Sequence, residues 1–201
     1  MLSSDDRQRL AAAVKFSKKH DERPETAWWL ITGAPGSGKT TLVSQFAAHG
    51  LQTVEDPGRA EFETNLSIGI SPETVRKNYL EFQRKVLQRE LAAIQVTELN
   101  CRTVFDYGIA ECLAFMKLSG LYWEDCFINA AARVKFEKIF LLDLVPLDKN
   151  KEDSIRAETI EARIYLHNLI NELYETLGYQ VIRVPLLPPS ERFSWIIDNG
   201  Y

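Results

Sequence analysis

The fold of this chain is decided by Gly33-Ala34-Pro35-Gly36-Ser37-Gly38-Lys39-Thr40. This stretch fits the pattern Gly-x-x-x-x-Gly-Lys-Ser/Thr at every fixed position. The apolar run 27–32 before it predicts a buried strand, and the amphipathic run 39–48 after it predicts a helix. A chance glycine-rich turn is the alternative, but a strand, this loop and a helix in that order favour a site for phosphate groups.

The chemistry of a triphosphate explains the residue types in this loop. Glycines let backbone N–H groups turn toward an anion, and the following helix adds its own free N–H groups. We expect Lys39 to reach the outer phosphates and the Thr40 hydroxyl to hold Mg²⁺. The expected nucleotide is ATP, with GTP as the alternative. The predicted nucleotide-binding residues are Gly33, Pro35, Gly36, Ser37, Gly38, Lys39, Thr40 and Thr41.

The composition is that of a soluble globular protein. With 201 residues, 45% of them hydrophobic and 26% charged, the chain suits one domain over 1–201 with a leading helix within 1–24. The net charge of -4 argues against broad nucleic-acid binding. The three cysteines show no Cys-x-x-Cys spacing, which argues against a zinc site. Neither a signal peptide nor a membrane-spanning run is visible, so we expect a cytoplasmic protein.

Strand and helix signals alternate, which predicts an α/β fold with a mostly parallel sheet. The strands are expected at about 27–32, 51–54, 102–106, 135–143 and 180–184. The helices are expected at 5–20, 39–49, 71–96, 109–118 and 122–134, then up to about 177, and from 190 to about 199. An apolar stripe within 71–96 predicts core packing, and it consists of Leu80, Leu87, Leu91 and Ile94.

Three aspartates follow the ends of predicted strands, namely Asp56, Asp106 and Asp143. Ligands bind beyond the carboxyl ends of parallel strands, so all three are candidates for the phosphate site. An isolated aspartate at such a position is often only a loop or capping residue. A sheet order of 2-3-1-4-5 would resemble that of small-molecule P-loop kinases, in which the acid after the third strand lies close to Mg²⁺. We therefore prefer Asp106 to Asp143 as the partner of Thr40.

Two arginines follow a polar stretch that suits a lid at about 147–160. Arg156 and Arg163 are seven residues apart on one predicted helix and therefore share a face. Arginines that close onto a transferring phosphoryl group stabilise its charge in the transition state. The alternative is a solvated face paired with neighbouring glutamates. Arg59 is a candidate for binding the acceptor, or else a surface residue.

Three further segments, together with the loop, carry a resemblance to a known family. They are Asp56-Pro57-Gly58-Arg59, Asp106-Tyr107-Gly108 and Glu191-Arg192. From about residue 27 to 197 the chain resembles the AAA-like ATPase/kinase family that includes the ribosylnicotinamide kinase domain of the bacterial NAD-metabolism regulator. The resemblance implies a three-layer P-loop NTPase fold with a five-stranded parallel sheet, order 2-3-1-4-5, flanked by helices.

The chain departs from that family at two positions. Tyr107 stands where related kinases have an arginine that contacts the acceptor or the phosphates, and Asp56 is one methylene shorter than the usual glutamate. The length of the chain leaves no room for the extra helical domain of ring-forming AAA+ motors.

Two functions agree with these residues. The first is a small-molecule kinase that transfers the γ-phosphoryl group of ATP to a hydroxyl of a nucleoside-like or other small acceptor. Its expected catalytic residues are Lys39, Asp56, Arg156 and Arg163, with Asp56 accepting the acceptor proton or orienting its hydroxyl. The second is a nucleotide-binding switch with slow hydrolysis and a protein partner, which Tyr107 favours. A lipid-phosphate binder has family analogy alone behind it.

Overall fold

Five parallel strands form the centre of the molecule. A computed structural model describes residues 1–145 and 159–200 of the chain. The strands are β1 (Trp29–Thr32), β2 (Gln52–Val54), β3 (Thr103–Phe105), β4 (Lys138–Leu142) and β5 (Val181–Val184). Their order is β2-β3-β1-β4-β5, and every neighbouring pair is parallel. The predicted sheet and its order 2-3-1-4-5 are therefore confirmed.

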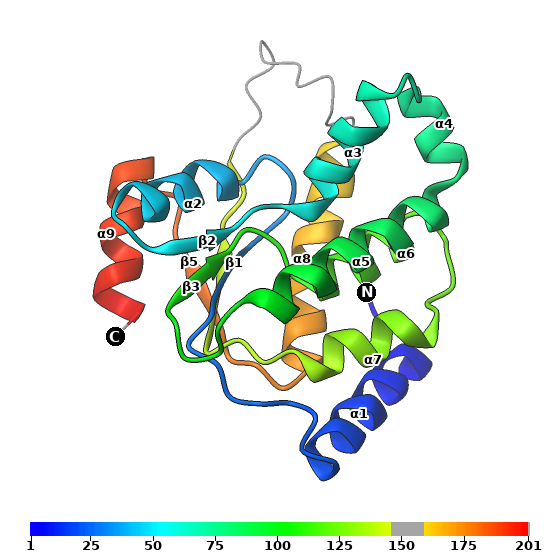
Figure 1. The fold of residues 1–201 in the computed structure, drawn as a ribbon, viewed down its shortest axis with the longest axis horizontal. Helices are drawn as coiled ribbons and strands as arrows, with labels where there is room; N and C mark the ends of the chain where they lie inside the picture. Colours follow the sequence, from blue (N-terminus) through cyan, green and yellow to red (C-terminus); the bar gives the residue numbers. More distant parts are fainter. Residues whose placement is uncertain (146–158, 201) are drawn as a thin grey trace.

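Helices cover both faces of the sheet (Figure 1). Within the described ranges they are α1 (Ser4–Lys19), α2 (Lys39–Ala48), α3 (Pro57–Ser67), α4 (Pro72–Lys77), α5 (Tyr79–Val96), α6 (Ile109–Leu118), α7 (Asp125–Arg133), α8 (Ile160–Thr176) and α9 (Pro189–Gly200). Helices α2 and α9 lie on one face, and α5, α6 and α8 lie on the other, with α1 packed against α7. The arrangement is the predicted three-layer α/β fold.

The strands alternate their side chains between two separate apolar cores. Leu30 packs into the core beneath α5, α6 and α8, whereas Trp29 and Ile31 pack into the core beneath α2 and α9. All three side chains are fully buried. Successive strand residues point to opposite faces, so a strand covered on both sides must be apolar throughout. The buried strand predicted from the apolar run 27–32 is thus confirmed, with Trp28 and Trp29 both in the core.

The predicted helix over 71–96 is wrong in one respect, because it consists of two helices. Ser71 caps α4 as expected, its hydroxyl accepting from the Thr74 N–H. The chain then leaves helical geometry at Asn78, whose N–H closes α4 and whose carbonyl accepts from the Phe82 N–H at the start of α5. The apolar periodicity continues through this break, so the sequence pattern hides it.

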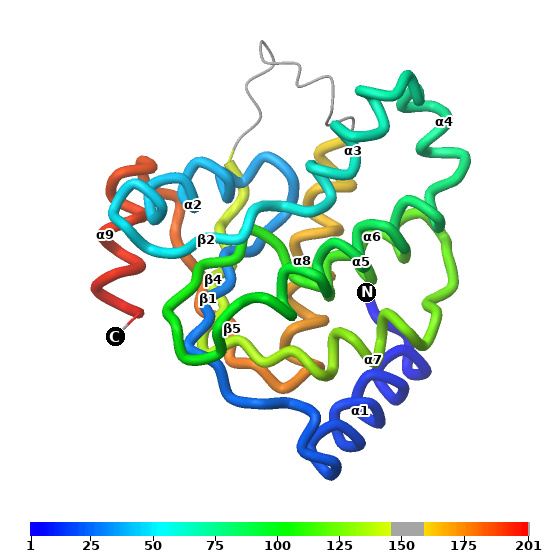
Figure 2. Tube along the Cα trace, in the orientation of Figure 1, coloured from blue at the N-terminus to red at the C-terminus, as the bar shows by residue number. Residues whose placement is uncertain are grey.

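Helix α3 is absent from the sequence prediction. It begins with Asp56 as N-cap and Pro57 in its first turn, a strong start signal. Capping is one of the two roles expected for Asp56, but no helix is predicted after it. Figure 2 shows that α3, α4 and the first turns of α8 gather at the edge of the sheet where the strands end. That edge is where a ligand binds in an open parallel sheet.

The predicted apolar stripe of α5 is only partly correct. Leu87 is 5% exposed and belongs to the core, whereas Leu91 is 41% exposed. Leu80 and Ile94 are partly buried against the same core. Successive residues of a helix are rotated by about 100°. Leucines chosen from the sequence alone therefore need not all lie on the face that packs against the core.

Substituting these two leucines tests the orientation of α5. We expect Leu87→Ala to lower the free energy of unfolding by about 2–5 kcal/mol, because it leaves a cavity in the core. Leu91→Ala should cost less than half as much, since its side chain keeps much of its contact with water. Urea unfolding of the two variants measures the difference. Equal losses at both positions would show that α5 is rotated relative to this structure.

Candidate active site

The loop between β1 and α2 has a backbone that glycine alone adopts easily. Gly33, Gly36 and Gly38 have φ angles of 144°, 76° and 93°. A Cβ atom on Gly33 would lie 2.9 Å from the Ser37 Oγ and 3.1 Å from the Leu142 carbonyl oxygen. Gly38 is the N-cap of α2 and has no side chain to cap the first N–H groups. The helix therefore presents these donors to whatever the loop binds.

Three cationic side chains bind the carbonyl oxygens of this loop. The Lys39 Nζ donates to the Gly33 carbonyl at 2.8 Å and to the Ala34 carbonyl at 3.4 Å. The Arg163 Nε, from α8, donates to the Pro35 carbonyl at 2.8 Å. The Arg192 Nη1, from α9, donates to the Ser37 carbonyl at 2.7 Å.

These contacts orient the peptide groups of the loop. In a trans peptide the C=O and the next N–H point in opposite directions. When Arg163 and Arg192 hold the Pro35 and Ser37 carbonyls, the N–H groups of Gly36 and Gly38 face away from the two guanidinium groups. Both arginines are buried, at 6% and 4% exposed. The fold thus fixes the donors of an anion site before any anion binds.

Thr40 and Asp106 meet directly at the carboxyl end of the sheet. The Thr40 hydroxyl donates to the Asp106 Oδ2 at 2.8 Å. Asp106 is 1% exposed, and its N–H donates to the Val54 carbonyl, which holds it at the end of β3. A hydroxyl and a carboxylate are oxygen donors of the kind that Mg²⁺ prefers. The pair predicted to hold the metal is therefore assembled from two elements, and its chemistry fits Mg²⁺.

Asp56 and Arg59 lie at the start of α3. The Asp56 Oδ1 accepts from the Gly58 N–H at 2.8 Å and from the Arg59 N–H at 3.2 Å, so it is the N-cap of the helix. The capping alternative raised by the sequence is thus realised, with one carboxylate oxygen. Arg59 forms an ion pair with Glu63 one turn later, at 3.3 Å. Both side chains also face the cavity described next.

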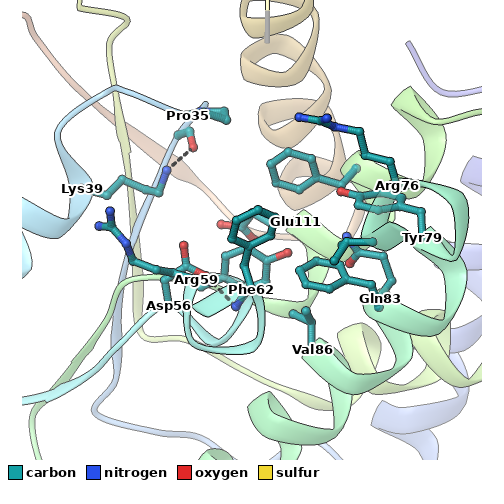
Figure 3. A pocket seen from close by; sticks show the side chains of 16 residues that line it. Pro35, Lys39, Asp56, Arg59, Phe62, Arg76, Tyr79, Gln83, Val86 and Glu111 are labelled. Atoms are coloured by element: carbon teal, nitrogen blue, oxygen red, sulfur yellow. Dashed lines mark hydrogen bonds between the residues drawn. The ribbon is translucent and has the colours of Figure 1, made fainter. Parts of the chain in front are cut away.

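A cavity of about 210 Å³ opens beside the loop. Its walls come from the loop, α3, α4, α5 and α6, and it is lined by both polar and aromatic side chains. In Figure 3, Lys39, Asp56 and Arg59 lie at one end of the cavity, and Arg76, Tyr79 and Gln83 lie at the other. The position beside the phosphate loop makes this cavity the candidate site for a small second substrate.

Two glutamates near the cavity are buried, and one of them, Glu111, lines it. Glu111 accepts hydrogen bonds from the Thr32 hydroxyl and the Tyr174 hydroxyl, and burial raises its pKa to about 7. Glu90 is fully buried, and among the described residues neither of its carboxylate oxygens has a hydrogen-bond partner. Burial, followed by the nearby carboxylates of Glu111 and Asp56, raises the pKa of Glu90 well above its usual value. The buried site thus favours the protonated form of Glu90.

Tyr107, at the family's arginine position, is 6% exposed and lines the cavity. Its hydroxyl donates to the Cys112 Sγ at 3.6 Å, and burial raises the pKa of the phenol well above its usual value. The side chain stays neutral and supplies no cation. The cations on the cavity wall are Lys39, Arg59 and Arg76.

Of the two arginines in the lid hypothesis, only Arg163 lies within the described residues. Helix α8 begins at Ile160 with Thr159 as its N-cap, and Arg163 lies in its first turns. Arg156 and most of the predicted lid region 147–160 lie outside the described residues. Arg163 contacts the loop and also donates to the Val145 carbonyl at 3.1 Å.

Comparison with known proteins agrees with this geometry. A family model described as an AAA domain matches residues 28–192, and the chain belongs to that family. No curated protein matches the sequence significantly. Deoxyadenosine kinase from M. mycoides with bound dATP aligns with a TM-score of 0.67 over 86% of this chain and 98% of the other, at 16% identity. The same enzyme with dCMP and a flexible dCDP gives a TM-score of 0.63 over 86% and 97%, at 17% identity.

These findings confirm the predicted P-loop fold and the AAA family, but not the narrower relation to ribosylnicotinamide kinase. Structural similarity at this low identity establishes the fold that the chain shares with deoxyadenosine kinase. Among the described residues, no helix is long and apolar enough to cross a membrane. In the same part of the chain, no group of three or more His, Cys, Asp or Glu side chains is arranged to hold a metal ion.

Several residues of the site escape the sequence analysis. Arg192 appears there only as part of a family resemblance, and Glu90, Glu111 and Gln83 do not appear at all. One sequence signal was also missed, because Asn150-Lys151-Glu152-Asp153 fits the guanine-associated pattern Asn-Lys-x-Asp. These four residues lie outside the described part of the chain, and they are a reason to keep GTP as an alternative to ATP.

The buried Glu90 predicts a specific pH dependence of stability. The usual pKa of the glutamate side chain is 4.5, and folding raises it. Above pH 4.5 the unfolded chain releases a proton that the folded chain keeps, so stability falls as pH rises toward the folded pKa. Glu90→Gln removes this contribution. We expect the variant to gain stability relative to the wild type as pH increases from about 4 to 8.

Urea unfolding at several pH values measures this difference. Glu98→Gln, at an exposed position just after the end of α5, is the matched control. Its stability relative to the wild type should not change with pH in this way. A wild-type protein and a Glu90→Gln variant with parallel pH profiles would mean that Glu90 ionises normally.

Proposed function

We propose that this protein is a P-loop kinase that transfers the γ-phosphoryl group of ATP to a hydroxyl of a small acceptor. The observation that carries the proposal is the cavity beside the phosphate loop, lined at one end by Lys39 and Asp56. A nucleotide switch needs no enclosed space for a second small molecule next to its phosphates. The AAA family membership and the fold shared with deoxyadenosine kinase support the proposal.

The nucleotide is expected to bind with its phosphates on the loop. Backbone N–H groups from Gly36 to Thr41 donate to phosphate oxygens, while the Lys39 ammonium moves from the loop carbonyls to the outer phosphates. Thr40 and Asp106 are the residues that would hold Mg²⁺. When bound, Mg²⁺ neutralises charge on the β- and γ-phosphate oxygens.

The acceptor hydroxyl is expected to lie between Asp56 and the γ-phosphoryl group. Its oxygen forms the new bond to phosphorus, and the bond from phosphorus to the bridging oxygen breaks, so that ADP leaves with the electron pair. Asp56 orients the hydroxyl or takes its proton. Only the Asp56 Oδ1 accepts the capping N–H groups in the structure. The carboxylate can therefore cap α3 and serve the acceptor together.

Arginines supply the remaining positive charge. Arg59 faces the cavity and is proposed to bind a polar group of the acceptor. Arg163 is proposed to hold the loop and to add positive charge beside the phosphates. For Arg156 a role in the lid remains a proposal from the sequence alone.

The second candidate is a nucleotide-dependent switch that acts through a protein partner. The observation favouring it is Tyr107, a buried neutral side chain where related kinases have an arginine. A switch would bind nucleotide tightly, hydrolyse it slowly and phosphorylate no small molecule. Product analysis by mass separates the two functions.

Lys39→Ala tests the nucleotide site. The substitution removes the ammonium that contacts the outer phosphates, so phosphoryl transfer should fall by at least about 100-fold. A coupled assay of ADP release, with ATP and GTP compared, measures the loss. Lys15→Ala, an exposed position on α1, is the control and should match the wild type. Full turnover by Lys39→Ala would refute the assigned phosphate site.

Asp56→Asn tests the acceptor base without removing the helix cap. Asparagine caps helices about as well as aspartate, so the stability of α3 should be kept. The loss of a carboxylate base should lower kcat by about 100- to 10,000-fold while the Kd for ATP changes little. Asp56→Ala should lower stability as well as kcat. If Asp56→Asn keeps wild-type kcat and Asp56→Ala only unfolds more easily, then Asp56 is a cap and nothing more.

The first experiment on the unmodified protein is turnover of ATP and of GTP with Mg²⁺ across nucleosides and other small alcohols. A phosphorylated product identified by mass would establish a kinase and reveal its acceptor class. Tight nucleotide binding with slow hydrolysis across the whole panel would favour the switch.

A further inference from the structure

The end of the cavity far from the phosphate loop contains an unsatisfied amide. Gln83, on α5, is 2% exposed and lines the cavity. Its Oε1 has no hydrogen-bond partner among the described residues. Buried polar atoms in native proteins are nearly always satisfied, and an exception needs an explanation. A hydrogen-bond donor from a bound molecule provides one, because the amide faces the space in which that molecule would lie (Figure 3).

Aromatic rings line the same cavity. Phe62 comes from α3, Tyr79 and Phe82 from α5, and Phe115 from α6. The Tyr79 and Phe82 rings stack on each other, with centroids 5.7 Å apart and planes inclined by 15°. Flat aromatic surfaces favour a flat ring as their partner.

The two features together define the chemistry of the ligand. A side-chain amide offers one acceptor and two donors at its end, and so it pairs with a donor and an acceptor that are adjacent on a ring edge. A lipid chain would leave the amide unsatisfied, and a polyhydroxylated acid without a ring would leave the aromatic faces uncovered. The volume of about 210 Å³ limits the ligand to one small molecule.

We propose that Gln83 binds the hydrogen-bonding edge of a planar heterocycle that stacks on these rings, so that the acceptor is a nucleoside. The sugar hydroxyl then lies toward Asp56, at the opposite end of the cavity. The choice of hydroxyl rests on the proposed kinase function. Contact between Gln83 and the ring does not require phosphoryl transfer.

Calorimetric titration tests the contact directly. The probes are adenosine, guanosine, cytidine and uridine, with ribose and a C-nucleoside carrying a phenyl ring as ligands that lack the hydrogen-bonding edge. At least one nucleoside should bind the wild-type protein about 100-fold more tightly than the phenyl compound, because a desolvated amide rejects a ring that cannot pair with it.

Substitution of Gln83 provides a second test of the same contact. Gln83→Met keeps the length of the side chain and removes its hydrogen-bonding groups, so nucleoside affinity should fall about 100-fold while affinity for the phenyl compound is kept or gained. Gln83→Glu keeps the shape, removes both donors and should also weaken binding. Gln88→Met, on the exposed side of α5, is the matched control and should bind as the wild type does. Thermal unfolding of each variant confirms that it is folded.

Three results would overturn the proposal: no nucleoside binds, the phenyl compound binds as well as the nucleosides, or Gln83→Met and Gln83→Glu bind as the wild type does. Failure of the kinase proposal is a different result. In that case nucleosides bind through Gln83 and yet no phosphorylated product appears with ATP or GTP. The converse result is phosphorylation of an acceptor without a ring, at a rate unaffected by Gln83→Met. That result would support the proposed kinase function and refute the proposed nucleoside acceptor.

Discussion

The site depends on one constraint, which is that the carbonyl groups of the phosphate loop must point away from the space where anions bind. Lys39 donates to two of these carbonyls and Arg163 and Arg192 to one each, and the three side chains come from α2, α8 and α9. An unsupported loop of this composition would sample many conformations, because glycine loses more conformational freedom on folding than any other residue. Long-range contacts from buried arginines remove that freedom and leave the N–H donors oriented.

The charges around the loop are arranged in two zones. Cations contact the carbonyls of the loop, whereas the acids Glu90 and Glu111 are buried, and Glu111 forms part of the cavity wall. Glu111 joins β1 to α8 through the hydroxyls of Thr32 and Tyr174. The positive charge of Lys39 favours its ionised form, while burial opposes ionisation more strongly.

Features that depend on local sequence or on the ends of strands could be predicted. The phosphate loop is recognised from its sequence motif alone. The position of Asp106 beside Thr40 follows from the predicted strands and from the rule that ligands bind beyond strand ends. Two helix features were hidden: Asp56-Pro57 served both as a helix start and as a site motif, and the apolar pattern runs on through Asn78. The sequence could not predict the roles of Arg192, Gln83 and Glu90. These roles depend on which hydrogen-bond partners each side chain has or lacks, and only tertiary packing determines that.

The contact between Ser37 and Arg192 also has a consequence for synthesis of the chain. The two residues are 155 positions apart, so the loop is made long before the guanidinium that completes it. At roughly 5–20 residues per second, a ribosome needs on the order of ten seconds to add that length. For most of this interval the loop has its glycines and its lysine but lacks α8, and for all of it the loop lacks Arg192. The Ser37 carbonyl therefore receives its guanidinium partner only when the final helix has been made.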